Sequence, residues 1–161
     1  MMPDIKKILF ATRLSENSRH SLRYAFTIAK KFDAHITILH VIEPLSDEAK
    51  FAFAAYFEKE VELEMLVKRE ARVVDQMKEQ VQDFCKSELI DDALCKNTFS
   101  IKVAKGYPEE QILKAIIDLQ ADFLIMGAHE KGFTHTFLGD IAKRVLRRSQ
   151  IPSLIIPMQE H

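Results

Sequence analysis

The chain has 161 residues, 47% of them hydrophobic and 29% charged, a composition typical of a globular protein with a buried core. Its net charge of −1 argues against general binding to nucleic acid, which needs a strongly basic surface. No apolar run approaches the roughly 20 residues that span a bilayer, and the N-terminus lacks a signal peptide's apolar region. We therefore expect one domain, residues 1–161, that binds neither nucleic acid nor membrane.

The two cysteines, Cys85 and Cys95, have a spacing that fits no metal motif. A reducing cytosol is the simplest interpretation of so few cysteines, and it predicts a cytoplasmic protein.

The chain opens with a strand–helix–strand pattern, the unit of a parallel sheet. Residues 8–12 and 36–42 are apolar runs typical of buried strands, and Pro44 stops the second. Ser15 suits the N-cap of the helix between them. That helix carries its apolar residues at helical spacing: Leu22, Ala25, Phe26, Ala29 and Phe32.

The longest connection follows, from residue 46 to 92. Its apolar periodicity predicts one amphipathic helix over residues 61–87, with a shorter helical, aromatic-rich piece at 51–57. The aromatic piece either packs on the core, which we expect, or forms a lid or a partner surface. The four alternate glutamates of residues 58–64 are interpreted as a solvated face.

The second half repeats the alternation of strand and helix. Residues 98–103, 122–126 and 153–156 are the predicted strands, and prolines at both ends of the last one suit an edge strand. Gly106 and Pro108 form a turn into the helix before the second of these strands. Five strands and four helical segments predict a doubly wound α/β sandwich.

In such folds ligands bind beyond the carboxyl ends of the strands, here residues 12–15, 41–43, 105–106 and 126–129. The loop 126–140 then leads into a helix, and a helix N-terminus offers free N–H groups and a positive dipole end to a phosphate. The same loop carries two carboxylates, Glu130 and Asp140, which a phosphate site does not usually contain.

Several short motifs, in this order and at these spacings, make the chain resemble the universal stress proteins. They are Ile8-Leu-Phe-Ala-Thr with Ser15, His40-Val-Ile-Glu-Pro44, Gly106-Tyr-Pro108, Ala121-Asp122 to Gly127, and Gly139 through Ile151-Pro152. The resemblance implies a five-stranded parallel, Rossmann-like sheet in three layers, similar to the adenine nucleotide alpha hydrolases. It also implies a cytoplasmic homodimer, in which Leu154, Ile155 and Ile156 of the last strand pair with a second copy.

Many universal stress proteins bind ATP or AMP, and others bind neither. The resemblance places the nucleotide site at Thr12, Arg13, Val41, Met126, Gly127, His129, Glu130, Gly139, Asp140 and Ile141. The binding members carry Gly-x2-Gly-x9-Gly-Ser/Thr after the fourth strand. Here Glu130 replaces the middle glycine, Asp140 replaces the hydroxyl residue, and the gap to Gly139 is one residue shorter. Arg13 replaces an aspartate and Leu14 a common glycine.

These changes leave two hypotheses open. A carboxylate about 4 Å from a phosphate repels it by roughly 4 kcal/mol at an effective dielectric constant of about 20. Arg13 then reaches Asp140 or Glu130 and closes the pocket, giving a non-enzymatic stress-response protein that needs no cofactor and acts through partners. Alternatively Arg13 pairs with an anionic ligand and Asp140 caps the helix or binds Mg²⁺, giving an ATP- or AMP-binding switch with slow hydrolysis at most.

Other candidate residues favour ordinary roles. His129, Glu130 and His135 lack the spacing of a metal-binding helix, so no metal site is expected. His40 ends an apolar strand and is interpreted as a core histidine with its hydrogen bond made. The basic end of the last helix is explained by the helix dipole. No catalytic motif is present, so no catalytic residue is predicted.

Overall fold

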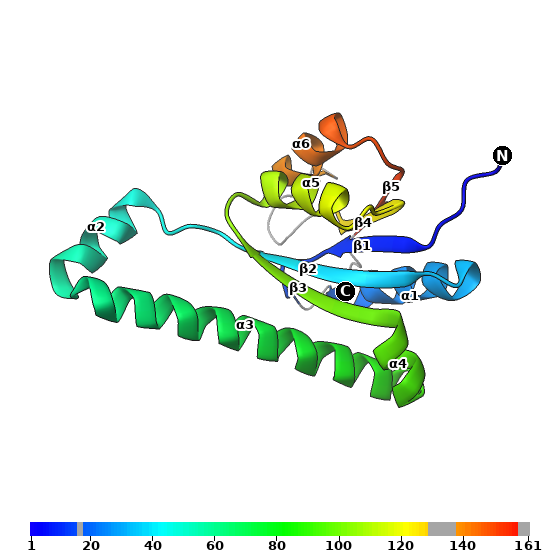
Figure 1. Cartoon of the computed structure of the whole chain (residues 1–161), viewed down its shortest axis with the longest axis horizontal. Coiled ribbons are helices and arrows are strands. Elements are labelled where there is room, and N and C mark those ends of the chain that lie inside the picture. The colour runs from blue at the N-terminus through cyan, green and yellow to red at the C-terminus, as the bar shows by residue number, and fades with distance from the viewer. Residues whose placement is uncertain (16–17, 129–137, 158–161) are drawn as a thin grey trace.

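The strands form one parallel sheet, in the computed structural model that describes residues 1–15, 18–128 and 138–157 (Figure 1). The strands are β1 (Lys7–Ala11), β2 (His35–Ile42), β3 (Phe99–Lys105), β4 (Phe123–Gly127) and β5 (Ser153–Ile156). Their order is β3-β2-β1-β4-β5, so the chain winds first to one side of β1 and then to the other. The predicted five-stranded, doubly wound sheet is confirmed, and β5 is an edge strand as its prolines predicted.

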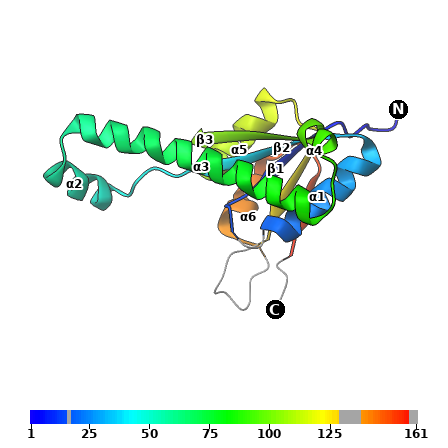
Figure 2. The ribbon, with the colours of Figure 1, turned by 90° about the horizontal axis from the view of Figure 1, so that it is seen from below.

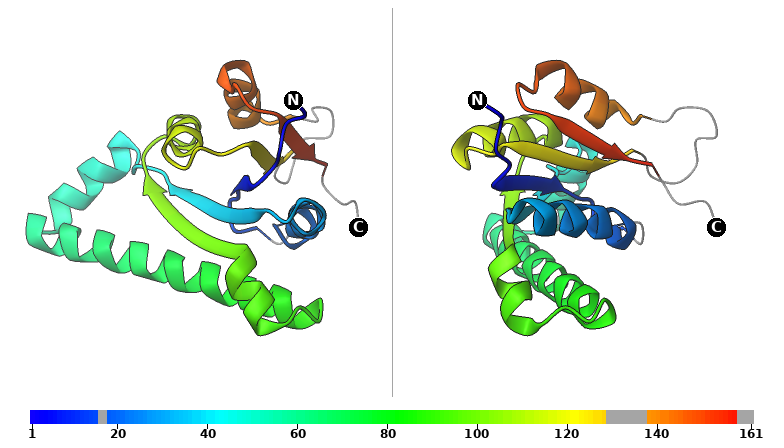
Figure 3. Two further views of the ribbon diagram at one scale, coloured as in Figure 1. Left: turned by 45° about the vertical axis from the view of Figure 1, so that its right-hand side comes forward. Right: turned by 90° about the vertical axis from the view of Figure 1, so that its right-hand side faces the viewer.

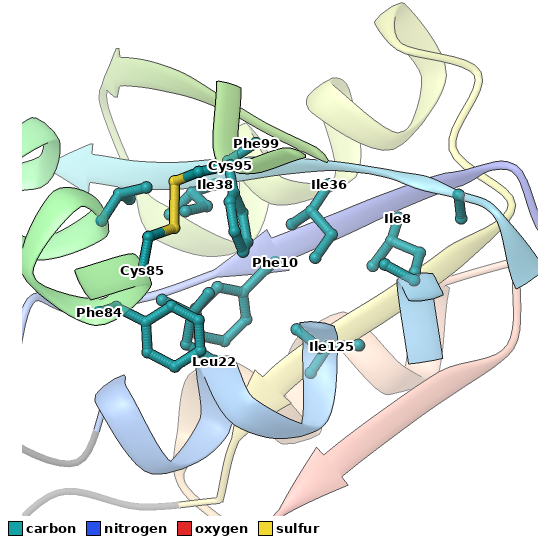
Figure 4. Packing of buried hydrophobic residues seen from close by; sticks show 14 of the residues in the cluster. Ile8, Phe10, Leu22, Ile36, Ile38, Phe84, Cys85, Cys95, Phe99 and Ile125 are labelled. Carbon is teal, nitrogen blue, oxygen red and sulfur yellow. A yellow bond between two sulfur atoms is a disulfide. The ribbon is translucent and has the colours of Figure 1, made fainter. Parts of the chain in front are cut away.

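Helices cover both faces of the sheet and make three layers (Figure 3). One face carries α1 (Ser18–Phe32), α3 (Lys59–Ser87) and α4 (Asp92–Thr98), and the other carries α5 (Pro108–Asp118) and α6 (Asp140–Arg148). Alternate residues of each strand supply the two cores. Ile8 and Phe10 face α1 (Figure 4), while Leu9 between them packs with α5 and α6. Both faces of β1 are buried, which explains its uninterrupted apolar sequence.

The connection between β2 and β3 leaves the body of the protein. α2 (Asp47–Tyr56) and the first half of α3 extend beyond the sheet (Figure 2). The long helix begins two residues before its predicted start and ends at the predicted residue. No residue of α2 is buried, so the expectation that the aromatic segment packs on the core is wrong. Phe53 instead contacts Phe57, with ring centroids 4.8 Å apart. Within the described ranges, each helix is too short or too polar to cross a bilayer.

The two cysteines form a disulfide, contrary to the interpretation that a reducing environment leaves them as thiols. The sequence analysis missed α4, the short helix that carries Cys95. The chain reverses after α3, so Cys85 and Cys95 come to a Cα–Cα distance of 6.2 Å, within the range that a disulfide spans. Both side chains are buried beside Phe84 and Phe99 (Figure 4).

The reversal after α3 is made by Leu89 in the left-handed conformation, with φ of 55°. Leu89 is 93% exposed, so its side chain contributes almost no packing. We expect Leu89→Gly to raise the free energy of unfolding by about 1 kcal/mol, because glycine adopts this helix-ending conformation without steric cost. Urea denaturation followed by circular dichroism measures the change. Leu89→Ala, which keeps a Cβ, should leave stability near the wild-type value, and an equal gain from both variants would contradict this account.

Candidate functional site

A cavity of about 290 Å³ opens at the carboxyl ends of β1, β2 and β4. Eight of the ten predicted site residues line it: Thr12, Arg13, Val41, Met126, Gly127, Gly139, Asp140 and Ile141. The other two, His129 and Glu130, lie outside the described residues, as does His135. The cavity therefore lies beyond the carboxyl ends of the strands, at the point where the strand order reverses. From β1, the sheet continues to β2 and β3 on one side and to β4 and β5 on the other.

The loop after β1 is fixed by a small hydrogen-bond network. The hydroxyls of Thr12 and Ser18 lie 2.8 Å apart, and the N–H of Leu14 donates to Thr12 Oγ1 at 3.3 Å. His40 Nδ1 lies 3.0 Å from the carbonyl oxygen of Thr12, so the ring nitrogen donates to that oxygen. The expected hydrogen bond of His40 is present, but the residue is half-buried and belongs to neither core, so it is not the core histidine that was predicted. Its hydrogen bond helps to fix the first wall of the cavity.

Leu14 has a φ of 60°, in the left-handed region. For a leucine this conformation costs roughly 1–2 kcal/mol, whereas glycine adopts it freely. This turn therefore suits the glycine that the resemblance described above leads one to expect at this position. The leucine side chain packs against the core beside α1, which offsets part of that cost.

The N-terminus of α6 forms the opposite wall. Gly139 is the N-cap, and its N–H donates to the carbonyl oxygen of Ala128 at 2.9 Å. Asp140 is the first helical residue and Gly139 holds the N-cap position, so the prediction that Asp140 caps the helix is wrong. Its charge still lies at the positive end of the helix dipole. The N–H groups of Asp140, Ile141 and Ala142 have no acceptor in the preceding turn, and all three residues line the cavity.

Arg13 lies against a different carboxylate from the one expected. Its Nη2 is 3.9 Å from Glu43 Oε1, and both side chains are about half exposed. Among the described residues Arg13 forms no ion pair with Asp140, so that part of the closure hypothesis is wrong. The part that involves Glu130 lies outside the described residues. With Asp140 and Glu43 both lining it, the described wall carries two carboxylates and one arginine.

The sequence analysis missed the contribution of two helices. Ser18, His20 and Ser21 of α1, and Pro108 and Ile112 of α5, also line the cavity. Ser21 is buried on the apolar face of α1, next to Leu22. A small polar residue on an apolar helix face was the signal in the sequence that could have identified it. Within the described ranges, His, Cys, Asp and Glu side chains do not gather in groups of three or more that could hold a metal.

The two helices of this cavity wall are tied together by ion pairs. Arg144 Nη1 donates to Glu109 Oε1 at 3.0 Å, and Arg148 donates to Glu110. The hydrogen bond from Arg148, with its charge, lowers the pKa of Glu110. Two of the four cations of α6, Arg144 and Arg148, are thus bound to the start of α5, a role the helix dipole alone did not predict.

The family model described as "Universal stress protein family" matches residues 4–157. A curated relative, "Universal stress protein MJ0577" of Methanocaldococcus jannaschii, is 27% identical over 159 residues, covering 94% of each chain. The solved "Universal stress protein UspA from Lactobacillus plantarum" superposes with a TM-score of 0.70 at 18% identity, covering 96% of this chain and 99% of that one.

Two other similar structures contain a nucleotide by their descriptions. One is a "universal stress protein in complex with cAMP", with a TM-score of 0.63 at 17% identity, covering 96% of this chain and 98% of its own. The other is the "universal stress protein from Archaeoglobus fulgidus in complex with dAMP", with a TM-score of 0.56 at 12% identity, covering 96% and 99%. At these identities the likeness establishes the fold alone.

Proposed function

We propose that this chain, which belongs to the universal stress protein family, is a non-enzymatic binding protein whose cavity takes an adenine nucleotide weakly and which acts through protein partners. The observation that carries the proposal is the open cavity of about 290 Å³ at the switch point of the sheet. This volume is close to the lower end of the range of small-molecule sites. Among the described residues, Arg13 lies against Glu43, and both line the cavity.

The two ends of the cavity differ in chemistry. Apolar side chains, Leu39, Ile112 and Met126, form a surface suited to a base. The start of α6 offers N–H groups to phosphate, but Asp140 adds a negative charge at the same place. Because the described residues contain no metal-binding group of their own, Mg²⁺ would arrive with the nucleotide and offset that charge.

The proposal includes a homodimer formed through β5. Its outer backbone edge has no partner strand in the described sheet, which supports pairing with a second copy. Leu154 and Ile155 are half-buried, while Ile156 is buried and lines the cavity of its own chain. Pairing at β5 would therefore adjoin the cavity. We also propose a cytoplasmic location. The disulfide must then resist cytoplasmic reductants, and the burial of Cys85 and Cys95 favours that resistance.

Isothermal titration with ATP tests the nucleotide proposal. We expect binding in the presence of Mg²⁺ to be about tenfold tighter than in its absence, because the metal reduces repulsion by Asp140. Adenosine, which has no phosphate, should bind equally well under both conditions. Absence of heat with adenosine and with ATP, both with and without Mg²⁺, would remove the nucleotide from the function. Phosphate release from the same ATP samples, at or below the buffer rate, is the result expected of a protein that is not an enzyme.

A further inference from the structure

A second cavity, of about 350 Å³, lies between α3 and the carboxyl ends of β2 and β3. Three segments form most of its lining: the connection that follows β2, one side of α3, and the turn that follows β3. That connection extends away from the sheet in the same direction as α3 (Figures 1 and 2). The volume lies within the range of small-molecule sites, so this cavity is large enough to hold a ligand of its own.

The side of α3 that lines this cavity is the side that packs on the domain farther along the helix. Glu62, Leu66 and Arg69 line the cavity, and they follow one another at spacings of four and three residues. The same face continues to Val73 and to the buried Met77, which belong to the core. The face is therefore apolar where it packs on the sheet and carries two charges where it borders the cavity.

The walls of the cavity are joined by bonds that do not involve Arg69. The N–H of Gly106 donates to the carbonyl oxygen of Ile42 at 3.1 Å, which links the ends of β3 and β2. The ammonium group of Lys105 pairs with Glu70, which links the end of β3 to α3. The fold thus holds the cavity walls in place and leaves the guanidinium of Arg69 available to a ligand.

The charges on the lining favour an anion. Three cations and two carboxylates line the cavity: Lys50, Arg69, Lys105, Glu43 and Glu62. Glu43 also lies 3.9 Å from Arg13, which does not line this cavity. In the part of the chain that the structure describes, Arg69 makes no ion pair. Glu62 lies two helical turns from Arg69, about 10 Å along the axis, so an anion at Arg69 is separated from that carboxylate.

We propose that this second cavity binds a small carboxylate with an apolar body, and that Arg69 holds the carboxylate. A guanidinium can donate two parallel N–H bonds to a carboxylate, which is why arginine is favoured for this role. Ile42, Leu45 and Leu66 line the cavity and supply apolar surface for the rest of the ligand. A long acyl chain would extend as far as Glu62, so a ring or a short chain is the body that fits.

Benzoate is the probe, titrated into isotope-labelled protein and followed by amide chemical shifts. We expect the shifts to centre on residues 42–45, 62–69 and 105–106, which line the second cavity. Benzamide has the same ring without the charge, and acetate has the charge without the ring. Each should bind at least tenfold more weakly than benzoate, because each lacks one of the two contacts.

Substitutions on α3 test the two contacts separately. Arg69→Gln should weaken benzoate binding about tenfold and leave benzamide binding unchanged. Lys68→Gln is the matched control, since it removes the same charge one residue earlier from a side chain that does not line the cavity. It should keep the wild-type affinity. Leu66→Ala should weaken benzoate and benzamide alike. Arg69 and Lys68 are exposed, so both variants should fold, and circular dichroism checks that they do.

Three results would overturn the proposal. The first is equal benzoate affinity in Arg69→Gln and wild type, and the second is the absence of any shift with benzoate. The third is a set of shifts confined to the first cavity, which would mean that benzoate occupies the site proposed for the nucleotide. The two cavities share Glu43 but no other lining residue, so the shifts distinguish them. Loss of ATP binding alone would leave this test unaffected.

Discussion

Reduction of the Cys85–Cys95 disulfide is expected to lower the free energy of unfolding by about 3 kcal/mol. The crosslink joins residues ten apart in sequence, and closing a loop of about that length removes this much chain entropy from the unfolded state. The native state should change little, because both sulfurs lie in the core with Phe84 and Phe99. Urea denaturation with and without dithiothreitol measures the effect, followed by circular dichroism because the chain has no tryptophan.

A variant without the two sulfurs separates the crosslink from the reagent. Cys85→Ala with Cys95→Ala should unfold at the same urea concentration with and without dithiothreitol. It should also be less stable than the reduced wild type, since each alanine leaves a small cavity. If mass spectrometry shows two free thiols in the reduced wild type and its midpoint still equals that of the oxidised protein, the disulfide contributes nothing to stability.

The strands were predictable because the strands of a parallel sheet covered on both faces are nearly continuous runs of apolar residues. Residues 8–12, 36–42 and 122–126 were recognised as buried, and β1, β2 and β4 occupy nearly the same positions. Proline at both ends of the last strand marked it as an edge strand, where a missing N–H does no harm. The short helix α4 was missed because its seven residues are too few to show a period.

The partners of side chains were harder to predict than their positions. The sequence predicted that the aromatic-rich residues 51–57 are helical, and most of them lie in α2, but burial depends on whether another element lies beneath the helix, and no residue of α2 is buried. The sequence could not distinguish a disulfide between the two cysteines from two free thiols. The turn at Leu89 brings the sulfurs together, and it lacks the glycine that would have predicted a helix end there. In both cases the missing information is tertiary.

In the candidate site, too, the positions of the residues were predictable and their charge partners were not. The sheet topology placed the predicted residues around one cavity, since every parallel strand ends at the same edge. The charge partner of Arg13 depended on side-chain reach, and among the described residues the carboxylate that it contacts is Glu43, which follows β2. The repulsion attributed to Asp140 therefore has no neutralising arginine among the described residues.

Asp140→Ser is expected to tighten ATP binding in the absence of Mg²⁺ by about tenfold. The full repulsion of roughly 4 kcal/mol applies to a charge shielded from water, and Asp140 is exposed, so only about a third of that should be recovered. Serine also supplies the hydroxyl of the Gly-x2-Gly-x9-Gly-Ser/Thr pattern that the resemblance implies at this position. With Mg²⁺ present the gain should shrink, because the metal already offsets the carboxylate. Calorimetric titration of wild type and variant, each with and without Mg²⁺, gives the four affinities required.

Stability provides an independent check on the same variant. Removing a carboxylate from the first turn of α6 should lower the free energy of unfolding by about 0.5 kcal/mol, since the charge there interacts favourably with the helix dipole. Tighter binding together with lower stability would therefore mark a charge effect at the site. Asp118→Ser, which removes the same charge at the far end of α5, is the matched control and should leave ATP affinity unchanged.

The role of Arg13 is decided by a second substitution in the same background. Among the described residues Arg13 lies against Glu43, and comparing Asp140→Ser with and without Arg13→Ala shows whether Arg13 also limits binding in the cavity. If the gain appears only after Arg13→Ala is added, Arg13 closes the cavity and the arrangement with Glu43 is not the one that governs binding. If neither variant gains affinity, the charge of Asp140 does not limit nucleotide binding, and the apolar surface at Leu39, Ile112 and Met126 becomes the next target for substitution.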